Sequence, residues 1–155
     1  MNWQSSTARI YATSDTTSDT TSDTVSDAAL LDTHALIWYS VTPQKLSSPA
    51  LEFIRKREHR IYVSAMTAWE IAIKVRLGKL EQARLLYRDY PRSLAQYGFL
   101  ELPFTSVHAL AAAELASEHK DPFDRALGAQ ALSEQMPIIT QDALVAGLPG
   151  VEVLW

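Results

Sequence analysis

Residues 29–36 read Ala-Leu-Leu-Asp-Thr-His-Ala-Leu, an apolar run that ends at a carboxylate and then changes to a helical pattern. We predict a short buried strand over 29–31, because a parallel strand that is covered on both faces is a brief, continuous apolar run. Asp32 then stands at the carboxyl end of this strand, where ligand-facing residues of open α/β sheets collect. The alternative for Asp32 is an N-cap of the following helix.

The same pattern of a short apolar run followed by a helical segment recurs along the chain. Further strands are predicted at 61–63, 99–102, 137–140 and 151–154, and helices from Ser48, from Ser64 or Thr67 to about Leu77, and over 82–96, 106–117, 121–135 and 143–146. Strands that alternate with helices indicate a parallel sheet covered by crossover helices. The fold class is therefore α/β, with five strands in the sheet.

The composition fits one globular domain. The chain has 155 residues, of which 47% are hydrophobic, enough for one core and too few to expect two. It has no cysteine, which excludes disulfides and thiolate zinc sites. It shows no basic-then-apolar leader and no apolar run approaching the ~20 residues that cross a bilayer. We therefore expect a cytoplasmic protein that does not enter a membrane.

The first 28 residues differ from the rest. Residues 14–27 repeat Ser-Asp-Thr-Thr with almost no apolar side chain, and such a segment cannot offset its ordering entropy. We predict a disordered, low-complexity extension over 1–28 and one domain over 29–155; a partner-binding arm is the alternative for the extension. The extension carries three of the chain's four net negative charges, so the domain itself is almost neutral.

Further carboxylates are predicted at the same edge of the sheet as Asp32. Glu70 lies in the first turns of the helix after the second strand, Asp121 and Asp124 open the helix before the fourth strand, and Asp142 follows that strand. Each has an ordinary alternative, because Glu70 fits a capping box and the aspartates fit N-caps. The prediction that all these carboxylates lie at one edge of the sheet is what indicates a functional site.

Several ionised carboxylates in one place need protonation or a cation. Two of them at ~4 Å repel by about 4 kcal/mol at an effective dielectric constant of 20. A cluster of oxygen donors without cysteine selects hard ions, Mg²⁺ or Mn²⁺. Such ions can hold a phosphodiester and activate water, so the pattern predicts metal-dependent phosphodiester chemistry.

Four segments resemble, in order, the motifs of PIN-domain toxins of the VapC type, which are ribonucleases of toxin–antitoxin pairs. They are Leu-Leu-Asp-Thr-His at 30–34, Ser-x-x-Thr-x-Trp-Glu-Ile at 64–71, Asp-Pro-Phe-Asp-Arg-x-Leu-x-Ala-Gln-Ala at 121–131 and Ile-Ile-Thr-x-Asp at 138–142. The resemblance covers about residues 29–155. It implies a PIN-like three-layer fold with sheet order 3-2-1-4-5, an acidic pocket for Mg²⁺ or Mn²⁺, endonucleolytic cleavage of RNA, and inhibition by a cognate antitoxin.

The resemblance also implies roles for individual residues. By position, Asp32, Glu70, Asp124 and Asp142 occupy the catalytic and metal-binding sites of the family, and Asp121 is a ligand, an outer group or only a cap. We expect a homodimer that binds a small antitoxin. The long N-terminal extension departs from the family pattern, in which the first strand begins within a few residues of the start.

Other readings stay open at this point. One is a PIN-like module that acts mainly by binding a partner, although loss of one or two of the acids would be expected there. Another is a structure-specific DNA nuclease, whose usual extra helices for duplex DNA have no room in this chain. Candidate phosphate contacts are Lys74, Arg76, Lys79 and Arg125, for which solvated helix faces are the alternative. His34 is a weaker candidate for contact with substrate or metal.

Overall fold

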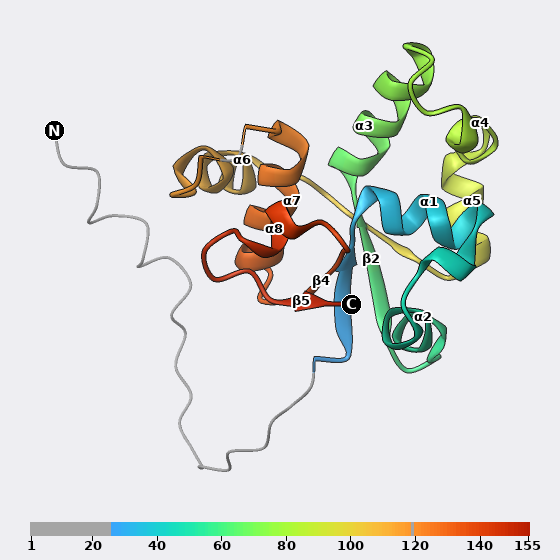
Figure 1. The fold of residues 1–155 in the computed structure, drawn as a ribbon, viewed down its shortest axis with the longest axis horizontal. Helices are drawn as coiled ribbons and strands as arrows, with labels where there is room; N and C mark the ends of the chain where they lie inside the picture. The colour runs from blue at the N-terminus through green and yellow to red at the C-terminus, as the bar shows by residue number, and fades with distance from the viewer. Residues whose placement is uncertain (1–25, 119) are drawn as a thin grey trace, which may run out of the picture.

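The computed structural model describes residues 26–118 and 120–155 (Figure 1). The strands are β1 (Ala28–Leu31), β2 (Arg60–Ser64), β3 (Leu100–Leu102), β4 (Ile138–Ile139) and β5 (Val153–Leu154). The α-helices are α1 (Thr33–Val41), α2 (Ser48–Arg55), α3 (Ala65–Arg76), α4 (Arg84–Arg88), α5 (Tyr90–Tyr97), α6 (Ser106–Glu114), α7 (Pro122–Ser133) and α8 (Ala143–Ala146). Two short 3-10 turns are η2 (Pro43–Lys45) and η3 (Glu81–Ala83).

The strands form one parallel sheet in the order β3-β2-β1-β4-β5, as the family resemblance implied. β1 lies at the centre, and its four residues are all buried. In the register of the sheet, Leu31 stands beside Val63 of β2 on one side and Ile139 of β4 on the other. The three strands therefore reach their carboxyl ends together.

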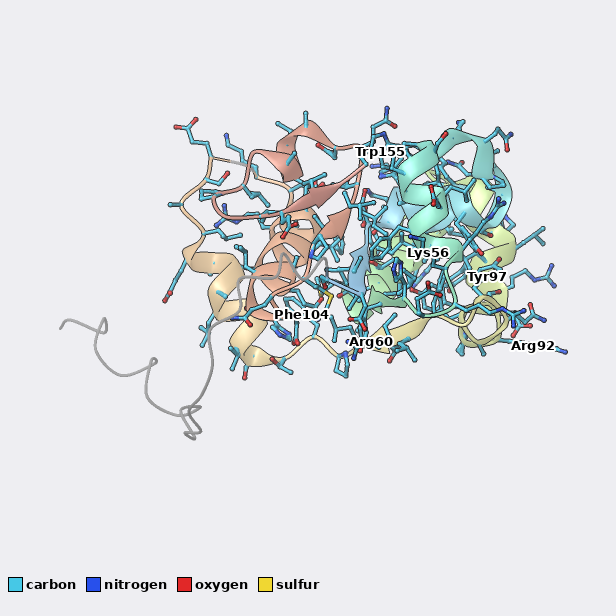
Figure 2. The ribbon with its side chains drawn as sticks, turned by 90° about the horizontal axis from the view of Figure 1, so that it is seen from below. Lys56, Arg60, Arg92, Tyr97, Phe104 and Trp155 are labelled. Carbon is cyan, nitrogen blue, oxygen red and sulfur yellow. The ribbon has the colours of Figure 1, made fainter. Side chains whose placement is uncertain are left out.

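Helices cover both faces of the sheet, which makes three layers (Figure 1). Leu31 and Ile139 face a core that includes Ile71 of α3 and residues of α1, α2, α4 and α5. Leu30 and Ile138 face a second core with Leu127 of α7 and residues of α8. Successive strand residues thus point to opposite layers, because side chains alternate along a strand. Figure 2 shows Tyr97 on the α1–α5 side of the molecule and Phe104 on the α6–α8 side.

Side-chain caps start the helices that follow or precede the central strands. Ser64 accepts from the N–H of Met66 at 3.0 Å, so α3 begins at Ala65 and not after Thr67. Helix α2 begins at Ser48 with a proline in its first turn, as predicted, and its cap is the preceding residue Ser47, which accepts from the N–H of Ala50. Such caps satisfy backbone donors that have no partner inside the helix.

Several predicted boundaries change. The single helix predicted over 82–96 is wrong, because η3, α4 and α5 divide this segment and Pro91 stands in the first turn of α5. Helix α6 ends at Glu114, earlier than predicted. Strand β1 begins at Ala28, one residue before the predicted start of the domain, and Asp27 forms an ion pair with Arg60.

The remainder of the predicted extension, residues 1–25, lies outside the described residues. Within residues 26–118 and 120–155, no helix has the length and apolar character needed to span a bilayer.

Candidate active site

The parallel register brings Asp32 next to Thr140 at the carboxyl edge of the sheet. One residue beyond the Leu31–Ile139 pair, the N–H of Asp32 donates to the carbonyl of Ile139 at 3.1 Å. The hydroxyl of Thr140 then donates to Asp32 Oδ2 at 2.9 Å. Asp32 is also the N-cap residue of α1 by position, but its side chain makes no cap hydrogen bond.

The carboxylate of Asp32 is buried and shares its surroundings with other acids. Its residue is 4% exposed, and this burial raises the pKa of Asp32 to about 6. The hydrogen bond from Thr140 and the charge of His34 oppose the rise, whereas the charges of Asp124 and Glu70 add to it. A carboxylate whose pKa is raised mainly by burial, with neighbouring acids adding to the rise, is a candidate for a functional site.

Glu70 is held by two partners of different kinds. Its residue is 3% exposed. The hydroxyl of Thr33 donates to Glu70 Oε2 at 2.6 Å, and the ammonium group of Lys74 pairs with Oε1. The capping-box alternative for Glu70 is wrong, because α3 starts at Ala65 and its first turn ends before Glu70. The side chain is free to cross to α1 instead.

Asp121 and Asp124 stand at the start of α7. Asp121 is the N-cap, and its Oδ1 accepts from the N–H groups of Phe123 at 2.8 Å and Asp124 at 3.3 Å. Asp124 is half-buried in the first turn of the same helix. Asp124 lies close enough for its charge to act on Asp32 and on Lys74, the partner of Glu70.

Asp142 lies on the β4 side of the same edge. Its N–H donates to Thr140 Oγ1 at 3.0 Å, and its Oδ1 accepts from the N–H of Leu144 at 2.7 Å, which makes it the N-cap of α8. A pocket of about 370 Å³ is lined by Asp32, His34, Trp38, Gln141 and Asp142. Asp142 therefore shares a pocket with Asp32, whereas Glu70 and Asp124 approach Asp32 from the α3 and α7 side.

The donor chemistry and the concentrated negative charge suit a hard divalent cation. Within the described ranges, 26–118 and 120–155, no three His, Asp or Glu side chains are gathered closely enough to hold a metal ion. Glu70 is engaged with Thr33 and Lys74, and Asp142 with a backbone N–H. The chemistry of the residues fits such an ion, and the ligand roles predicted for them stay predictions.

The basic residues have different surroundings. Partial burial lowers the pKa of Lys74, but its hydrogen bond to Glu70 and the charges of Glu70, Asp121 and Asp124 outweigh this effect and the pKa is raised. Arg76 and Lys79 are exposed near the end of α3. They remain candidate phosphate contacts.

The guanidinium group of Arg125, a candidate phosphate contact, is bound to backbone carbonyls. It donates to the carbonyls of Ala112 at 2.8 Å, Leu115 at 2.8 Å and Ser117 at 2.9 Å. These carbonyls lie at the end of α6 and in the segment after it. Arg125 therefore ties the end of α6, and the residues that follow it, to the start of α7.

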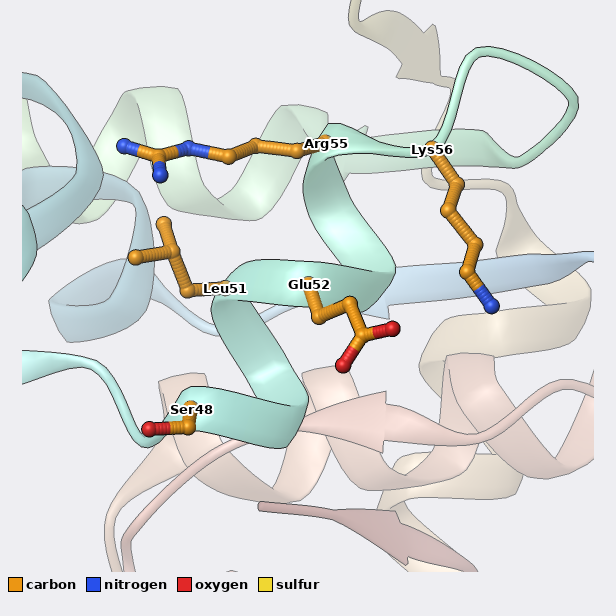
Figure 3. Close-up of a pocket in the computed structure, with 5 residues that line it drawn as sticks. All are labelled: Ser48, Leu51, Glu52, Arg55 and Lys56. Carbon is orange, nitrogen blue, oxygen red and sulfur yellow. The ribbon is translucent and has the colours of Figure 1, made fainter.

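A second pocket, of about 420 Å³, lies on the outer face of α2 and contains none of the predicted site acids. It is lined by Ser48, Leu51, Glu52, Arg55 and Lys56. Figure 3 shows Leu51 and Arg55 extending to one side of the helix and Lys56 to the other. Arg55 and Lys56 are exposed at the end of α2.

Sequence reasoning assigned no role to Thr33 and Thr140, although both hydroxyls hold predicted site carboxylates. A signal for Thr140 was present, since residues at matching ends of two neighbouring parallel strands stand side by side. Thr33 carried no such signal, because its bond to Glu70 joins two helices that are distant in the sequence.

Comparisons with known proteins agree with this architecture. The sequence profile of the PIN domain family matches residues 29–147. No curated protein sequence matches the chain.

Similar solved structures include a chain of VapBC2 from Rickettsia felis bound to a DNA fragment from their promoter, with 14% identity, a TM-score of 0.57, and coverage of 81% of this chain and 96% of that one. FitAcB from Neisseria gonorrhoeae is 20% identical, with a TM-score of 0.55 and coverage of 81% and 95%. VapBC-5 from Mycobacterium tuberculosis, described as a member of the VapBC family of toxin–antitoxin systems, is 21% identical, with a TM-score of 0.53 and coverage of 82% and 97%. At these identities the likeness concerns the fold.

Proposed function

The chain belongs to the PIN domain family, and on that premise we propose that it is a metal-dependent endoribonuclease that acts as the toxin of a toxin–antitoxin pair. The observation that carries the proposal is the buried carboxylate of Asp32, whose pKa is raised first by burial and further by the charges of Asp124 and Glu70. Burying several acids together is costly for stability, and a divalent cation that binds RNA phosphate offsets this cost.

In this proposal Asp32, Glu70, Asp124 and Asp142 would hold Mg²⁺ or Mn²⁺, with Asp121 as a further ligand or only the cap of α7. The chemistry that such an ion supplies when bound is neutralisation of phosphate charge and activation of water for attack on phosphorus. The chain's own contribution is orientation: Thr140 holds one oxygen of Asp32, and Thr33 holds one oxygen of Glu70. Both hydroxyls restrict the rotation of their carboxylates.

The RNA substrate is supported by the VapC-type motifs and by the chemistry of the pocket. Because the RNA 2′-hydroxyl is not needed as the nucleophile, we expect a 5′-phosphate and a 3′-hydroxyl at the cut. A histidine-driven ribonuclease would leave a cyclic phosphate instead.

The experiment is cleavage of total RNA by the purified protein, with Mg²⁺, with Mn²⁺ and with EDTA, followed by mapping of the cut ends. Asp32→Asn and Asp124→Asn remove charge at nearly constant size and should abolish cleavage, whereas Glu52→Gln, which removes a negative charge at an exposed site of α2, should leave cleavage unchanged. Cleavage that persists in EDTA, or an active Asp32→Asn variant, would refute the metal mechanism. Cleavage of structured DNA with no cleavage of RNA would favour the DNA-nuclease alternative.

The toxin role is supported by the motifs and by the similar folds in structures of toxin–antitoxin systems. Large apolar side chains are exposed on several helices, among them Trp69, Leu85 and Leu110, as expected where partners bind. We propose a homodimer that also binds a small antitoxin. Light scattering of the free protein and co-purification with the product of the neighbouring gene test this, and a monomer that binds no such product would leave a nuclease without the toxin role.

A further inference from the structure

We propose that Lys74 is the resident cation of the acidic site: its ammonium group neutralises Glu70 in the metal-free protein and is displaced when a divalent cation binds. The displacement of Lys74 rests on the proposed function, since it requires a bound metal. The neutralisation of Glu70 by Lys74 does not, because it concerns the metal-free chain alone.

The ion pair has an unusual position for one between residues four apart on a helix. The Glu70 side chain is 4% exposed and that of Lys74 is 30% exposed, whereas the pairs Arg84–Glu81 and Arg60–Asp27 are both more than half exposed. Lys74 therefore reaches inward along α3 to a carboxylate that has been removed from water. A buried carboxylate that loses its partner is strongly destabilising, so this contact matters more than a surface pair.

The same ammonium group lies within the field of the other acids. Asp121 and Asp124, both at the start of α7, act on Lys74 by their charge, in addition to Glu70. Asp32 in turn responds to Asp124 and Glu70. Lys74 is thus placed where several negative charges meet, and it brings one positive charge to them.

Lys74 also occupies the oxygen that a metal would use. Glu70 Oε2 accepts from Thr33, and Oε1 is the atom that pairs with the ammonium group. An ion that takes Glu70 as a ligand must share or replace this contact, because a carboxylate oxygen in direct contact with an ammonium group is a poorer donor to a second cation. The side chain of Lys74 can leave, since it is long, flexible and partly exposed.

The first test compares Lys74→Met with the wild type and with Lys79→Met. Lys79 is exposed just beyond α3, so its variant removes the same charge without touching Glu70. In EDTA we expect a lower unfolding temperature for Lys74→Met and no change for Lys79→Met. We expect Lys74→Met to bind Mn²⁺ about tenfold more tightly than the wild type, the effect of removing one competing, partly buried ion pair. Titration calorimetry or the spin resonance of free Mn²⁺ measures this affinity.

The second test uses the wild-type chain and does not depend on the folding of a variant. An amine-acylating reagent, with mass spectrometry of the peptides, reports the reactivity of each lysine with and without saturating Mn²⁺. We expect Lys74 to be protected in EDTA relative to Lys79 and to become several-fold more reactive with Mn²⁺, while Lys79 stays constant.

The outcomes separate the two proposals. Mn²⁺ binding that is unchanged or weaker in Lys74→Met, or Lys74 labelling that Mn²⁺ leaves unchanged, overturns the displacement and leaves the metal-dependent nuclease standing. Absence of Mn²⁺ binding in the wild type and in both variants overturns the metal mechanism and the displacement together. A Lys74→Met variant as stable in EDTA as the wild type overturns the role of Lys74 as internal counter-ion.

Discussion

Replacing Asp32 with Asn should stabilise the metal-free protein at neutral pH. Burial raises the pKa of Asp32 from 3.8 to about 6, with a further contribution from Asp124 and Glu70. The folded state therefore binds this proton more tightly than the unfolded state, and stability is highest below pH 3.8 and falls as the pH rises through the window to about 6. One unit of pKa corresponds to about 1.4 kcal/mol, so the ionised side chain costs about 3 kcal/mol above pH 7.

Asn removes this cost without removing the hydrogen bond to Thr140, because its amide oxygen can still accept from the hydroxyl. At pH 7.5 in EDTA, we expect the variant to gain about 3 kcal/mol at most, or roughly 10 °C in unfolding temperature. Near pH 4 the difference should nearly vanish. In saturating Mn²⁺ the wild type should be the more stable of the two, because only the wild type keeps the Asp32 carboxylate as a metal ligand.

The assay is urea unfolding at four values between pH 4 and pH 7.5, followed by tryptophan fluorescence. Glu52→Gln is the matched control, since Glu52 is exposed on α2 and its variant removes one negative charge far from the acids. An Asp32→Asn variant that is less stable than the wild type at pH 7.5 in EDTA, or a wild-type stability that is flat from pH 4 to pH 7, would refute the electrostatic reasoning.

Three further predictions concern the surroundings of the site. Arg125→Ala should lower the free energy of unfolding by roughly 3 kcal/mol, because several carbonyls lose a charged donor, and Arg125→Lys should recover only part of the loss in the same urea experiment. A chain without residues 1–25 should unfold within about 0.5 kcal/mol of the full chain and cleave RNA equally well, since the removed segment has no apolar pattern; marked loss of either would show that it contributes to the domain. His34→Ala should reduce RNA cleavage far less than Asp32→Asn, because His34 is exposed at the pocket while Asp32 is buried in it, and equal losses would return attention to the histidine.

The sequence pattern predicted the architecture because the pattern is a direct consequence of burial. Leu30 and Leu31 face opposite cores, so a strand covered on both sides must be apolar at consecutive positions. Asp32 directly follows β1, and Asp142 lies three residues after the end of β4; polar residues this close to the end of a buried strand lie at the edge of the sheet. The position of these acids therefore follows from chain order alone.

The partners of Glu70 could not be predicted in the same way. The partners of Glu70 depend on whether α3 begins after Ser64 or after Thr67. These two starts differ by three residues and give Glu70 different positions in the helix. With the cap at Ser64, Glu70 lies beyond the first turn and reaches Thr33 across the helix interface. That contact is tertiary, and no local rule contains it.

Arg125 shows a second limit of sequence reasoning. Its place next to Asp124 suggested a shared role at phosphate, but neighbouring residues on a helix point about 100° apart. The charge of Asp124 acts on Asp32, whereas Arg125 faces the end of α6 and donates to the carbonyls there. Adjacent letters in a motif can therefore belong to different surfaces of the same helix.

From the sequence, a role as helix cap and a role in the site were alternatives for each aspartate. In three dimensions one carboxylate can have both roles. Asp121 accepts both of its backbone N–H groups on Oδ1, and Asp142 also caps with Oδ1. A carboxylate has two oxygens, so a cap that uses one oxygen orients the other without consuming it. Helices α7 and α8 begin at the carboxyl edge of the sheet because the chain must cross back antiparallel to the strands. Capping therefore places carboxylates at the edge where a parallel sheet binds its ligands.

An Asp121→Ser variant keeps the cap but removes the charge, so it separates the role of Asp121 as a cap from its role as a metal ligand. We expect it to unfold within about 0.5 kcal/mol of the wild type. A weaker affinity for Mn²⁺ would assign Asp121 to the metal site, and an unchanged affinity would leave it as a cap.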